Sequence, residues 1–128
     1  MVKALFDTNI LIDYLNGIPD AGKEIGRYRE KAISLITWME VMVGATAQDE
    51  TIIKAFLSQF ELLPIDSTVS AEAVAIRRTR RIKLPDAIIL ATARTTDRLL
   101  VTRNTKDFPA GLDADVRLPY RLPQAPGA

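Results

Sequence analysis

The chain contains no histidine and no cysteine among its 128 residues. The lack of histidine removes the usual general base at neutral pH and the commonest neutral metal ligand. The lack of cysteine excludes thiolate nucleophiles, thiolate zinc sites and disulfides, which suits a reducing compartment. Carboxylates remain, and they bind hard cations such as Mg²⁺ or Mn²⁺. We therefore expect any catalysis to depend on acidic residues.

Long apolar runs are also missing. No stretch approaches the roughly 20 apolar residues that a membrane-spanning helix needs. The apolar run before Asp7 has three residues, which is too short for a signal peptide. We therefore expect a cytoplasmic protein without membrane association. The net charge of +1 indicates no class of partner, whereas 48% hydrophobic and 26% charged residues are typical of a globular domain.

Short apolar segments alternate with helical patterns along the chain. The predicted strands are residues 4–6, 32–36, 62–65 and 99–102, with a fifth candidate at 115–118. This alternation predicts an α/β fold, a three-layer α/β/α sandwich with a central, mostly parallel sheet of four to five short strands. We assign residues 1–118 to a single domain and residues 119–128 to a flexible, proline-rich tail.

Acidic residues lie near the ends of these apolar segments. Asp7 follows the first predicted strand, Glu40 lies about one turn beyond the second, and Asp86 opens an apolar helix. Asn104 and Asp107 follow the fourth strand. Ligands of open α/β sheets bind beyond the carboxyl ends of the strands, and crowded carboxylates repel one another until a cation relieves them. The sequence therefore predicts a metal site of Asp7, Glu40 and Asp86, assisted by Asn104 or Asp107.

Each acid also has a purely structural interpretation. Asp7 suits the N-cap of the following helix, and Thr37 with Glu40 matches a capping box. Asp86 follows a proline in a first helical turn, where an acid favours the helix dipole, and Asp107 suits a loop cap. These interpretations weaken when the acids are taken together, because independent caps need not fall at one edge of a sheet.

The carboxylate set predicts metal-assisted hydrolysis of a phosphodiester. Bound cations lower the pKa of water, clamp the phosphate and stabilise the leaving oxygen. Thr8 and Asn9 are close neighbours of Asp7, and we expect Asn9 to orient that carboxylate or to cap the helix. Asp13 lies in mid-helix, so we expect it to be solvated or to lie behind the metal ligands.

Four segments resemble the PIN-domain nucleases, and among them the VapC-type toxins of bacterial toxin–antitoxin pairs. They are LFDTNILIDYL, TWMEVMVGA, LPDAIILATA and LVTRNTKDF, in the family's order from about residue 5 to 108. The resemblance implies a magnesium-dependent ribonuclease that forms a homodimer and is inhibited by a cognate antitoxin. It also implies that Asp7, Glu40 and Asp86 form the metal site. The family's fourth position varies, and here an amide, Asn104, stands before Asp107.

A basic run lies just before Asp86 in the sequence. It comprises Arg77, Arg78, Arg80, Arg81 and Lys83. We expect Arg77, Arg80 and Arg81 to share a helix face that contacts RNA phosphates or an acidic antitoxin segment, because nucleic-acid affinity is largely electrostatic. The alternative is a solvated face or a set of salt bridges. Arg103 and Lys106 are weaker candidates for substrate binding.

Three other functions fit the same residues. Metal-assisted hydrolysis needs no 2′-hydroxyl, so the chain is also compatible with a DNA nuclease. A metal-dependent phosphatase would use Asp7 as its nucleophile, but the second aspartate expected two residues later is replaced by Asn9. A catalytically weak PIN-like module would bind RNA or a protein partner through the basic run.

Overall fold

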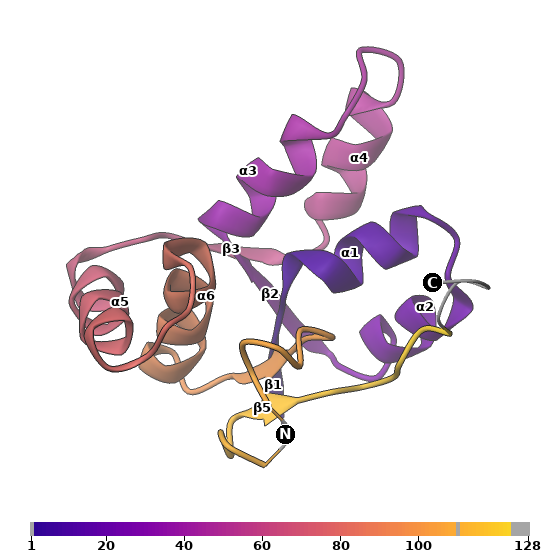
Figure 1. Cartoon of the computed structure of the whole chain (residues 1–128). Helices are drawn as coiled ribbons and strands as arrows, with labels where there is room; N and C mark the ends of the chain where they lie inside the picture. Colours follow the sequence, from indigo (N-terminus) through magenta and orange to yellow (C-terminus); the bar gives the residue numbers. More distant parts are fainter. Residues whose placement is uncertain (1, 110, 124–128) are drawn as a thin grey trace.

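The computed structural model describes residues 2–109 and 111–123, which form a five-stranded sheet flanked by helices. The strands are β1 (Lys3–Phe6), β2 (Glu30–Ser34), β3 (Glu61–Leu63), β4 (Leu99–Val101) and β5 (Val116–Arg117). The helices are α1 (Thr8–Leu15), α2 (Pro19–Ile25), α3 (Leu35–Val43), α4 (Glu50–Leu57), α5 (Ser67–Thr79) and α6 (Leu84–Thr95). Figure 1 shows the helices arranged around the sheet.

The first strand of the chain is the middle strand of the sheet. The order is β3-β2-β1-β4-β5, and every neighbouring pair is parallel. In the β1–β4 pair, Leu5 lies opposite Leu100. Because all five strands run in one direction, their carboxyl ends lie at one edge of the sheet, and the residues that follow them are brought together there.

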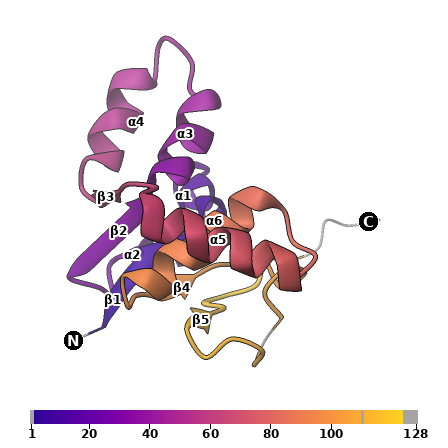
Figure 2. The same cartoon turned by 90° about the vertical axis from the view of Figure 1, so that its left-hand side faces the viewer.

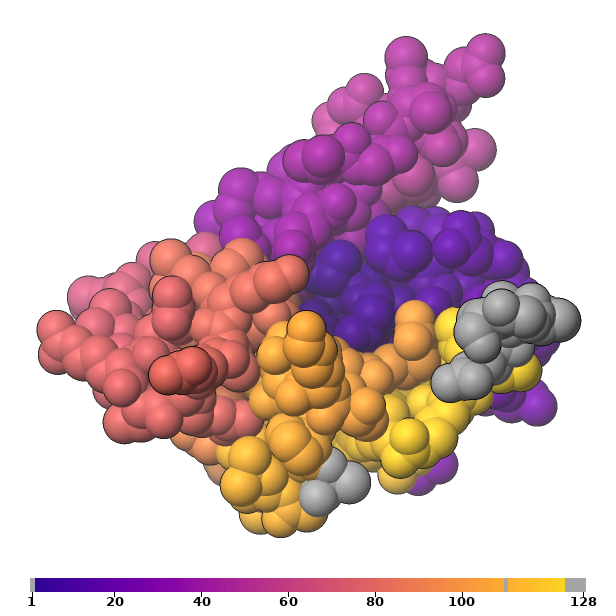
Figure 3. Space-filling model, in the orientation of Figure 1, coloured from indigo at the N-terminus to yellow at the C-terminus, as the bar shows by residue number. Residues whose placement is uncertain are grey.

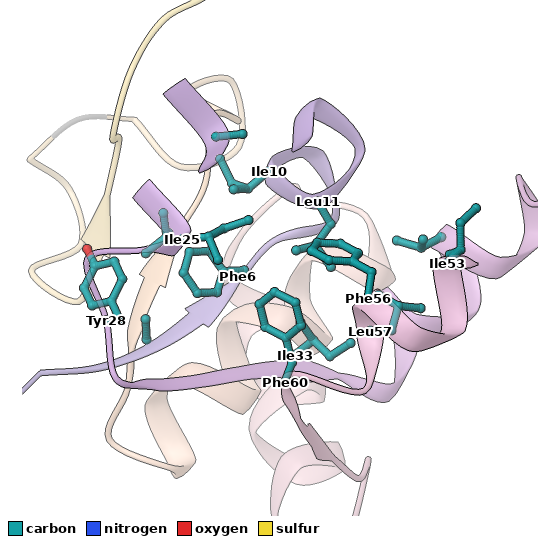
Figure 4. Packing of buried hydrophobic residues seen from close by; sticks show 14 residues of the cluster. Phe6, Ile10, Leu11, Ile25, Tyr28, Ile33, Ile53, Phe56, Leu57 and Phe60 are labelled. Atoms are coloured by element: carbon teal, nitrogen blue, oxygen red, sulfur yellow. The ribbon is translucent and has the colours of Figure 1, made fainter. Parts of the chain in front are cut away.

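The sheet has an apolar core on each face, because successive residues of a strand point to opposite sides. Ala4 and Phe6 join the core formed with α1, α2, α3 and α4, whereas Leu5 joins the core beneath α5 and α6. The Phe6 ring lies edge-on to Tyr28 and Phe60, with ring centroids 5.7 and 5.8 Å apart. Figure 4 shows this first core at close range.

The helices form the two outer layers. Helices α5 and α6 pack side by side (Figure 2) and cover one face of the sheet. Helices α1 and α2 pack on the other face, from which α3 and α4 project as a helical hairpin (Figures 1 and 2). The predicted three-layer α/β/α fold with a parallel sheet is confirmed, and the sheet has the larger of the two predicted strand numbers.

The strand boundaries differ from the prediction by one to a few residues. The second strand was expected at 32–36 but is β2, which ends at Ser34. It ends there because the Ser34 side chain accepts a hydrogen bond from the Ile36 main-chain N–H, 3.2 Å away, and so begins α3. The helix therefore takes the last two residues of the apolar run.

The start of the predicted tail packs against the domain. Tyr120 contacts the first core, and its hydroxyl donates a hydrogen bond to Asp13, 2.8 Å away. The packed domain thus continues beyond the predicted boundary at residue 118, because a buried carboxylate holds the tail's aromatic ring. Residues 124–128 of the predicted tail lie outside the described residues. Within residues 2–109 and 111–123, no helix combines the length and apolarity needed to cross a membrane.

Candidate active site

An open cleft lies at the carboxyl edge of the sheet. Its lining comprises Asp7, Thr8, Asn9, Ile12, Asp13, Glu40, Asp86, Arg103 and Asn104. These residues come from the starts of α1 and α6, from α3 and from the loop after β4, so four separate parts of the sequence form one site. Figure 3 shows indigo α1, coral α6 and the orange loop meeting on this face, beneath the projecting hairpin. A volume of about 390 Å³ leaves room for a phosphate group and the sugars on either side of it.

Asp7 is the buried centre of the cleft. It is the N-cap of α1, and its Oδ1 accepts a hydrogen bond from the Thr8 main-chain N–H, 2.7 Å away. Its Oδ2 accepts from the Thr102 hydroxyl at 2.7 Å and from the Asn9 amide at 3.3 Å. Burial raises the pKa of Asp7 despite these hydrogen bonds, and the charges of Glu40 and Asp107 raise it further. Asp7 therefore caps α1 with one carboxylate oxygen and still lines the cleft.

Glu40 is held by α1 and makes no capping box. Its Oε1 accepts a hydrogen bond from the Thr8 hydroxyl, 2.7 Å away, and that hydroxyl lies 3.1 Å from the hydroxyl of Thr37. Thr37 is buried within α3, whose N-cap is Ser34. The predicted capping box between Thr37 and Glu40 is wrong, because the helix begins one turn earlier. Glu40 is thus free of a capping role and points toward the start of α1.

Asp86 and Asp107 form a second pair of acids beside Asp7. Asp86 lies in the first turn of α6. Burial, the charge of Asp7 and a hydrogen bond with the Asp107 carboxyl together raise the pKa of Asp86 to about 7. Asp7, Asp86 and Asp107 therefore crowd one another at this edge of the sheet.

The loop after β4 brings both candidates for the fourth position to the site. The Asn104 amide donates to Asp107 Oδ2, 3.0 Å away, and Asn104 Oδ1 accepts from the Asp107 main-chain N–H at 3.2 Å. The Asn104 main-chain N–H in turn donates to the Thr102 hydroxyl at 3.0 Å. Asn104 lines the cleft and orients Asp107, while Asp107 carries the charge that faces Asp86.

The donor chemistry of the cleft fits a hard divalent cation. The carboxylates, two side-chain amides and a hydroxyl of the cleft supply oxygen ligands. Burial is the main cause of the raised pKa values of Asp7 and Asp86, and the charges of neighbouring acids add to it. Among residues 2–109 and 111–123, no three acids are grouped tightly enough to hold a metal ion as they stand. Glu40 is exposed, and its hydrogen bond with the Thr8 hydroxyl keeps it at the start of α1.

Comparison with known proteins identifies the family of this fold. Residues 4–110 match the family model described as the PIN domain. The chain belongs to the PIN-domain family. The match spans all the residues that line the cleft, from Asp7 to Asn104, and also Asp107.

The relatives of this PIN domain include VapC-type proteins. A chain of a toxin–antitoxin complex from Klebsiella pneumoniae is 48% identical with a TM-score of 0.88, and the match covers 94% of this chain and 100% of that one. The tRNA(fMet)-specific endonuclease VapC of Shigella flexneri is 28% identical over 120 residues, which are 84% of this chain and 91% of the relative. DNA-bound VapBC from Salmonella typhimurium, 22% identical with a TM-score of 0.72 over 84% of this chain and 91% of that one, shares the fold. The resemblance inferred from the four sequence segments is confirmed.

The basic run of this PIN domain does not form one helix face. Helix α5 ends at Thr79, and the backbone of Arg80 is extended, with φ −134° and ψ 144°. The predicted common face of Arg77, Arg80 and Arg81 is therefore wrong. Arg80 turns inward, pairs with Asp113 at 3.0 Å and donates to the Asp107 carbonyl at 2.9 Å. The exposed cations of the run are Arg77, Arg78, Arg81 and Lys83.

The sequence did not reveal several residues that hold the site. Asp13 is buried and paired with Arg103, where a solvated acid was one of two expectations. Thr102 holds Asp7 and Asn104 through one hydroxyl. The position of Thr102 directly after an apolar strand was an available signal, because Asp7 was singled out on the same ground. Tyr120 gave no such signal, since it is an isolated aromatic residue among prolines.

Proposed function

We propose that this PIN domain is a divalent-metal-dependent endoribonuclease and the toxin component of a toxin–antitoxin system. The observation that carries the proposal is the convergence of Asp7, Glu40 and Asp86 in one open cleft, with Asp107 hydrogen-bonded to Asp86 beside it. The relatives support it, because one is named as a tRNA(fMet)-specific endonuclease and another belongs to a toxin–antitoxin complex. We take the cell's cytoplasm as the site of action.

Asp7, Glu40 and Asp86 are the proposed metal ligands, with Asp107 as the fourth acid. A bound Mg²⁺ or Mn²⁺ supplies a Lewis acid that activates water and offsets the charge of the phosphate. The chain's own contribution is to hold the acids in place. Thr102 fixes Asp7 and Thr8 fixes Glu40, so that neither carboxylate has to be ordered when the substrate binds.

The proposed substrate is RNA, whose phosphates add negative charge to an acidic cleft and therefore need basic partners. Arg103 lines the cleft itself. Arg77, Arg81 and Lys83 are exposed near the start of α6, which carries Asp86. We propose that these cations contact the strand on either side of the cleaved bond, because phosphate contacts supply most of the sequence-independent affinity.

The proposed protein partners are a second copy of the chain and an antitoxin. The α3–α4 hairpin exposes Met39, Val43 and Ile52, whose exposed fractions are 40%, 86% and 70%. Apolar side chains grouped on a projecting element are typical of a surface that binds another protein. The proposal is that an antitoxin segment covers them beside the cleft and that two such domains associate.

The decisive experiment compares the wild-type protein with Asp7→Asn on total RNA, with Mg²⁺ or with EDTA, and sequences the 5′ ends produced. We expect discrete cleavage sites for the wild type with Mg²⁺ and none for the variant or with EDTA. A single-stranded DNA of matching sequence, left uncut, separates a ribonuclease from a DNA nuclease. Binding of RNA without any cleavage by the wild type would support the binding-module alternative, and full activity of Asp7→Asn would exclude the proposed site.

A further inference from the structure

Asp13 is a buried carboxylate that two distant parts of the chain approach together. Arg103 forms a two-pronged pair with it: Nε donates to Oδ2, and Nη2 donates to Oδ1 at 2.9 Å. The Tyr120 hydroxyl donates to Oδ2 at 2.8 Å. The Asp13 side chain is 6% exposed and that of Arg103 is 27% exposed. These three residues, which we call the Asp13 clamp, join α1, the loop after β4 and the C-terminal segment.

The clamp fixes Arg103 relative to the acids of the cleft. The main-chain N–H of Arg103 donates to Asn9 Oδ1 at 3.1 Å, and the Asn9 amide donates to Asp7 at 3.3 Å. Both the backbone and the guanidinium of Arg103 are therefore tied to α1. Because a two-pronged pair sets the plane of a guanidinium, Arg103 has little freedom to change its direction.

One end of the Arg103 guanidinium remains available. Nε and Nη2 bond to Asp13, whereas Nη1 has no hydrogen-bond partner in the part of the chain that the structure describes. Arg103 is also the one cation among the described residues that line the acidic cleft. A polyanion that enters this cleft thus meets one positively charged side chain, that of Arg103, on a wall that also carries acids.

Tyr120 closes the clamp from the side of solvent. It follows β5, packs against the first core and lies with Arg103 in the wall of a smaller pocket next to the cleft. Burial and the neighbouring Asp13 raise the pKa of Tyr120, so its hydroxyl stays protonated and acts as a donor. Its hydroxyl is the second donor to Asp13 Oδ2, beside Arg103 Nε.

We propose that Asp13 and Tyr120 are positioning residues for Arg103, and that Arg103 Nη1 binds a non-bridging phosphate oxygen of RNA next to the bond that is cut. The inference rests on the proposed nuclease function. A guanidinium that is already ordered loses little side-chain entropy on binding. The clamp therefore contributes to affinity for the substrate and not to the chemical step.

The test uses three tyrosine-to-phenylalanine variants that each remove one hydroxyl. Tyr120→Phe opens the clamp. Tyr28→Phe removes a hydrogen bond of the same length, 2.8 Å, to the buried Glu24 away from the cleft. Tyr14→Phe alters a tyrosine that is 43% exposed and stacks on Phe56. The probe is a fluorescein-labelled single-stranded RNA, with anisotropy measured in Ca²⁺ and cleavage measured in Mg²⁺.

We expect Tyr120→Phe to raise Kd and KM for the RNA about fivefold with kcat within about twofold of wild type, as the loss of one hydrogen bond allows. Tyr28→Phe should lower Tm as much as Tyr120→Phe does but keep the wild-type Kd and KM. Tyr14→Phe should leave Tm, Kd and KM unchanged. Arg103→Lys should raise Kd and KM as well. Adding Tyr120→Phe to Arg103→Lys should then have no further effect on binding, because Tyr120 acts through Arg103.

Two results would overturn the inference. One is a Tyr120→Phe protein with a lowered Tm that binds and cleaves the RNA like Tyr28→Phe. The clamp would then only stabilise the fold. The other is full additivity of the double variant. A wild-type protein that binds the RNA but does not cut it refutes the nuclease proposal alone, and the anisotropy series still decides the role of the clamp. A wild-type protein that does neither refutes both.

Discussion

The Thr102 hydroxyl donates a hydrogen bond of 2.7 Å to Asp7 Oδ2, and these two residues stand 95 positions apart in the sequence. The contact follows from the parallel pairing of β1 with β4, since Asp7 and Thr102 are the first residues after the two strands. The same hydroxyl accepts hydrogen bonds from Asn9 at 3.2 Å and from the Asn104 main chain at 3.0 Å. Thr102 is therefore the junction between the buried acid and the loop that carries Asn104.

Thr102→Val tests this junction, because valine keeps the shape and removes the hydroxyl. We expect a loss of about 1–2 kcal/mol in the free energy of unfolding, since buried donors and acceptors lose their partner. Affinity for Mg²⁺, measured by isothermal titration, should fall about three- to tenfold as the carboxylate of Asp7 becomes less well held. Thr92→Val is the matched control: this threonine is fully buried, and its hydroxyl donates at 2.7 Å to a carbonyl within α6. An unchanged Mg²⁺ affinity in Thr102→Val would remove the residue from the site.

Asp86→Asn tests the crowding of charge through its dependence on pH. Folding raises the pKa of Asp86 from an ordinary value of 3.8 to about 7. Between about pH 4 and about pH 7 the folded state binds more protons at this group than the unfolded state does, so the free energy of unfolding falls as pH rises through this window. We expect Tm in EDTA to decline over this window in the wild type and to decline less in the variant.

At pH 8 in EDTA, Asp86→Asn should therefore melt a few degrees above the wild type, since about 1 kcal/mol corresponds to roughly 3–5 °C in a domain of this size. Asp20→Asn is the matched control, because Asp20 also follows a proline in the first turn of a helix and is exposed. Binding of Mg²⁺ should have the opposite dependence on pH and strengthen through pH 7, because the ion competes with the proton. A Tm profile of Asp86→Asn that parallels the wild type would contradict this account.

Arg80→Ala and Arg81→Ala test whether Arg80 stabilises the fold while Arg81 contacts RNA. Arg80 pairs with the buried Asp113, so its removal should cost about 2 kcal/mol in the free energy of unfolding. The cost stays below that of an isolated buried pair because Arg94 also pairs with Asp113, at 2.8 Å. Arg81 is exposed, and its removal should leave Tm unchanged while it weakens RNA binding and lowers the salt dependence of that binding. An Arg80→Ala protein with the wild-type Tm and weaker RNA binding would show instead that Arg80 contacts RNA.

Glu24→Gln tests the ion pair that ties α2 to β5. Burial raises the pKa of Glu24, but the hydrogen bonds from Arg117 and Tyr28 outweigh it, and the net pKa is lowered. A lowered pKa contributes stability that is present above the ordinary value of 4.5 and is lost as pH falls below it. We expect the variant to be about 1–2 kcal/mol less stable at pH 7 and to approach the wild type near pH 3. A constant difference in Tm across this range would show that charge at Glu24 is unimportant.

The sequence was sufficient for the fold and for the acids because both follow from local patterns. Asp7 and Asp86 could be singled out because each stands at the end or the start of an apolar run, and parallel strands gather such positions at one edge. The predicted Thr37–Glu40 capping box was wrong because Ser34, and not Thr37, is the N-cap of α3. Arg80 was misplaced because helical spacing alone does not show that the helix stops at Thr79.

The contacts of Tyr120 lay beyond sequence reasoning for a different reason. Its partner Asp13 is 107 residues away, and no periodicity or spacing connects an aromatic residue among prolines with an acid in mid-helix. Of the two expectations for Asp13, a solvated acid is excluded by the same contact, whereas a position behind the acids of the cleft is compatible with it. Pairs of this kind are set by the packing of the whole domain, which a single sequence does not display.

The central position of β1 has a consequence for the order of events during synthesis. The ribosome makes Asp7 95 residues before Thr102, and it makes Asp13 107 residues before Tyr120. Until then the middle strand has a neighbour on one side only, and the buried acid lacks the hydroxyl that holds it. A nascent copy that has not yet made β4 therefore carries Asp7, Glu40 and Asp86 without Arg103 and Asn104, which complete the wall of the cleft.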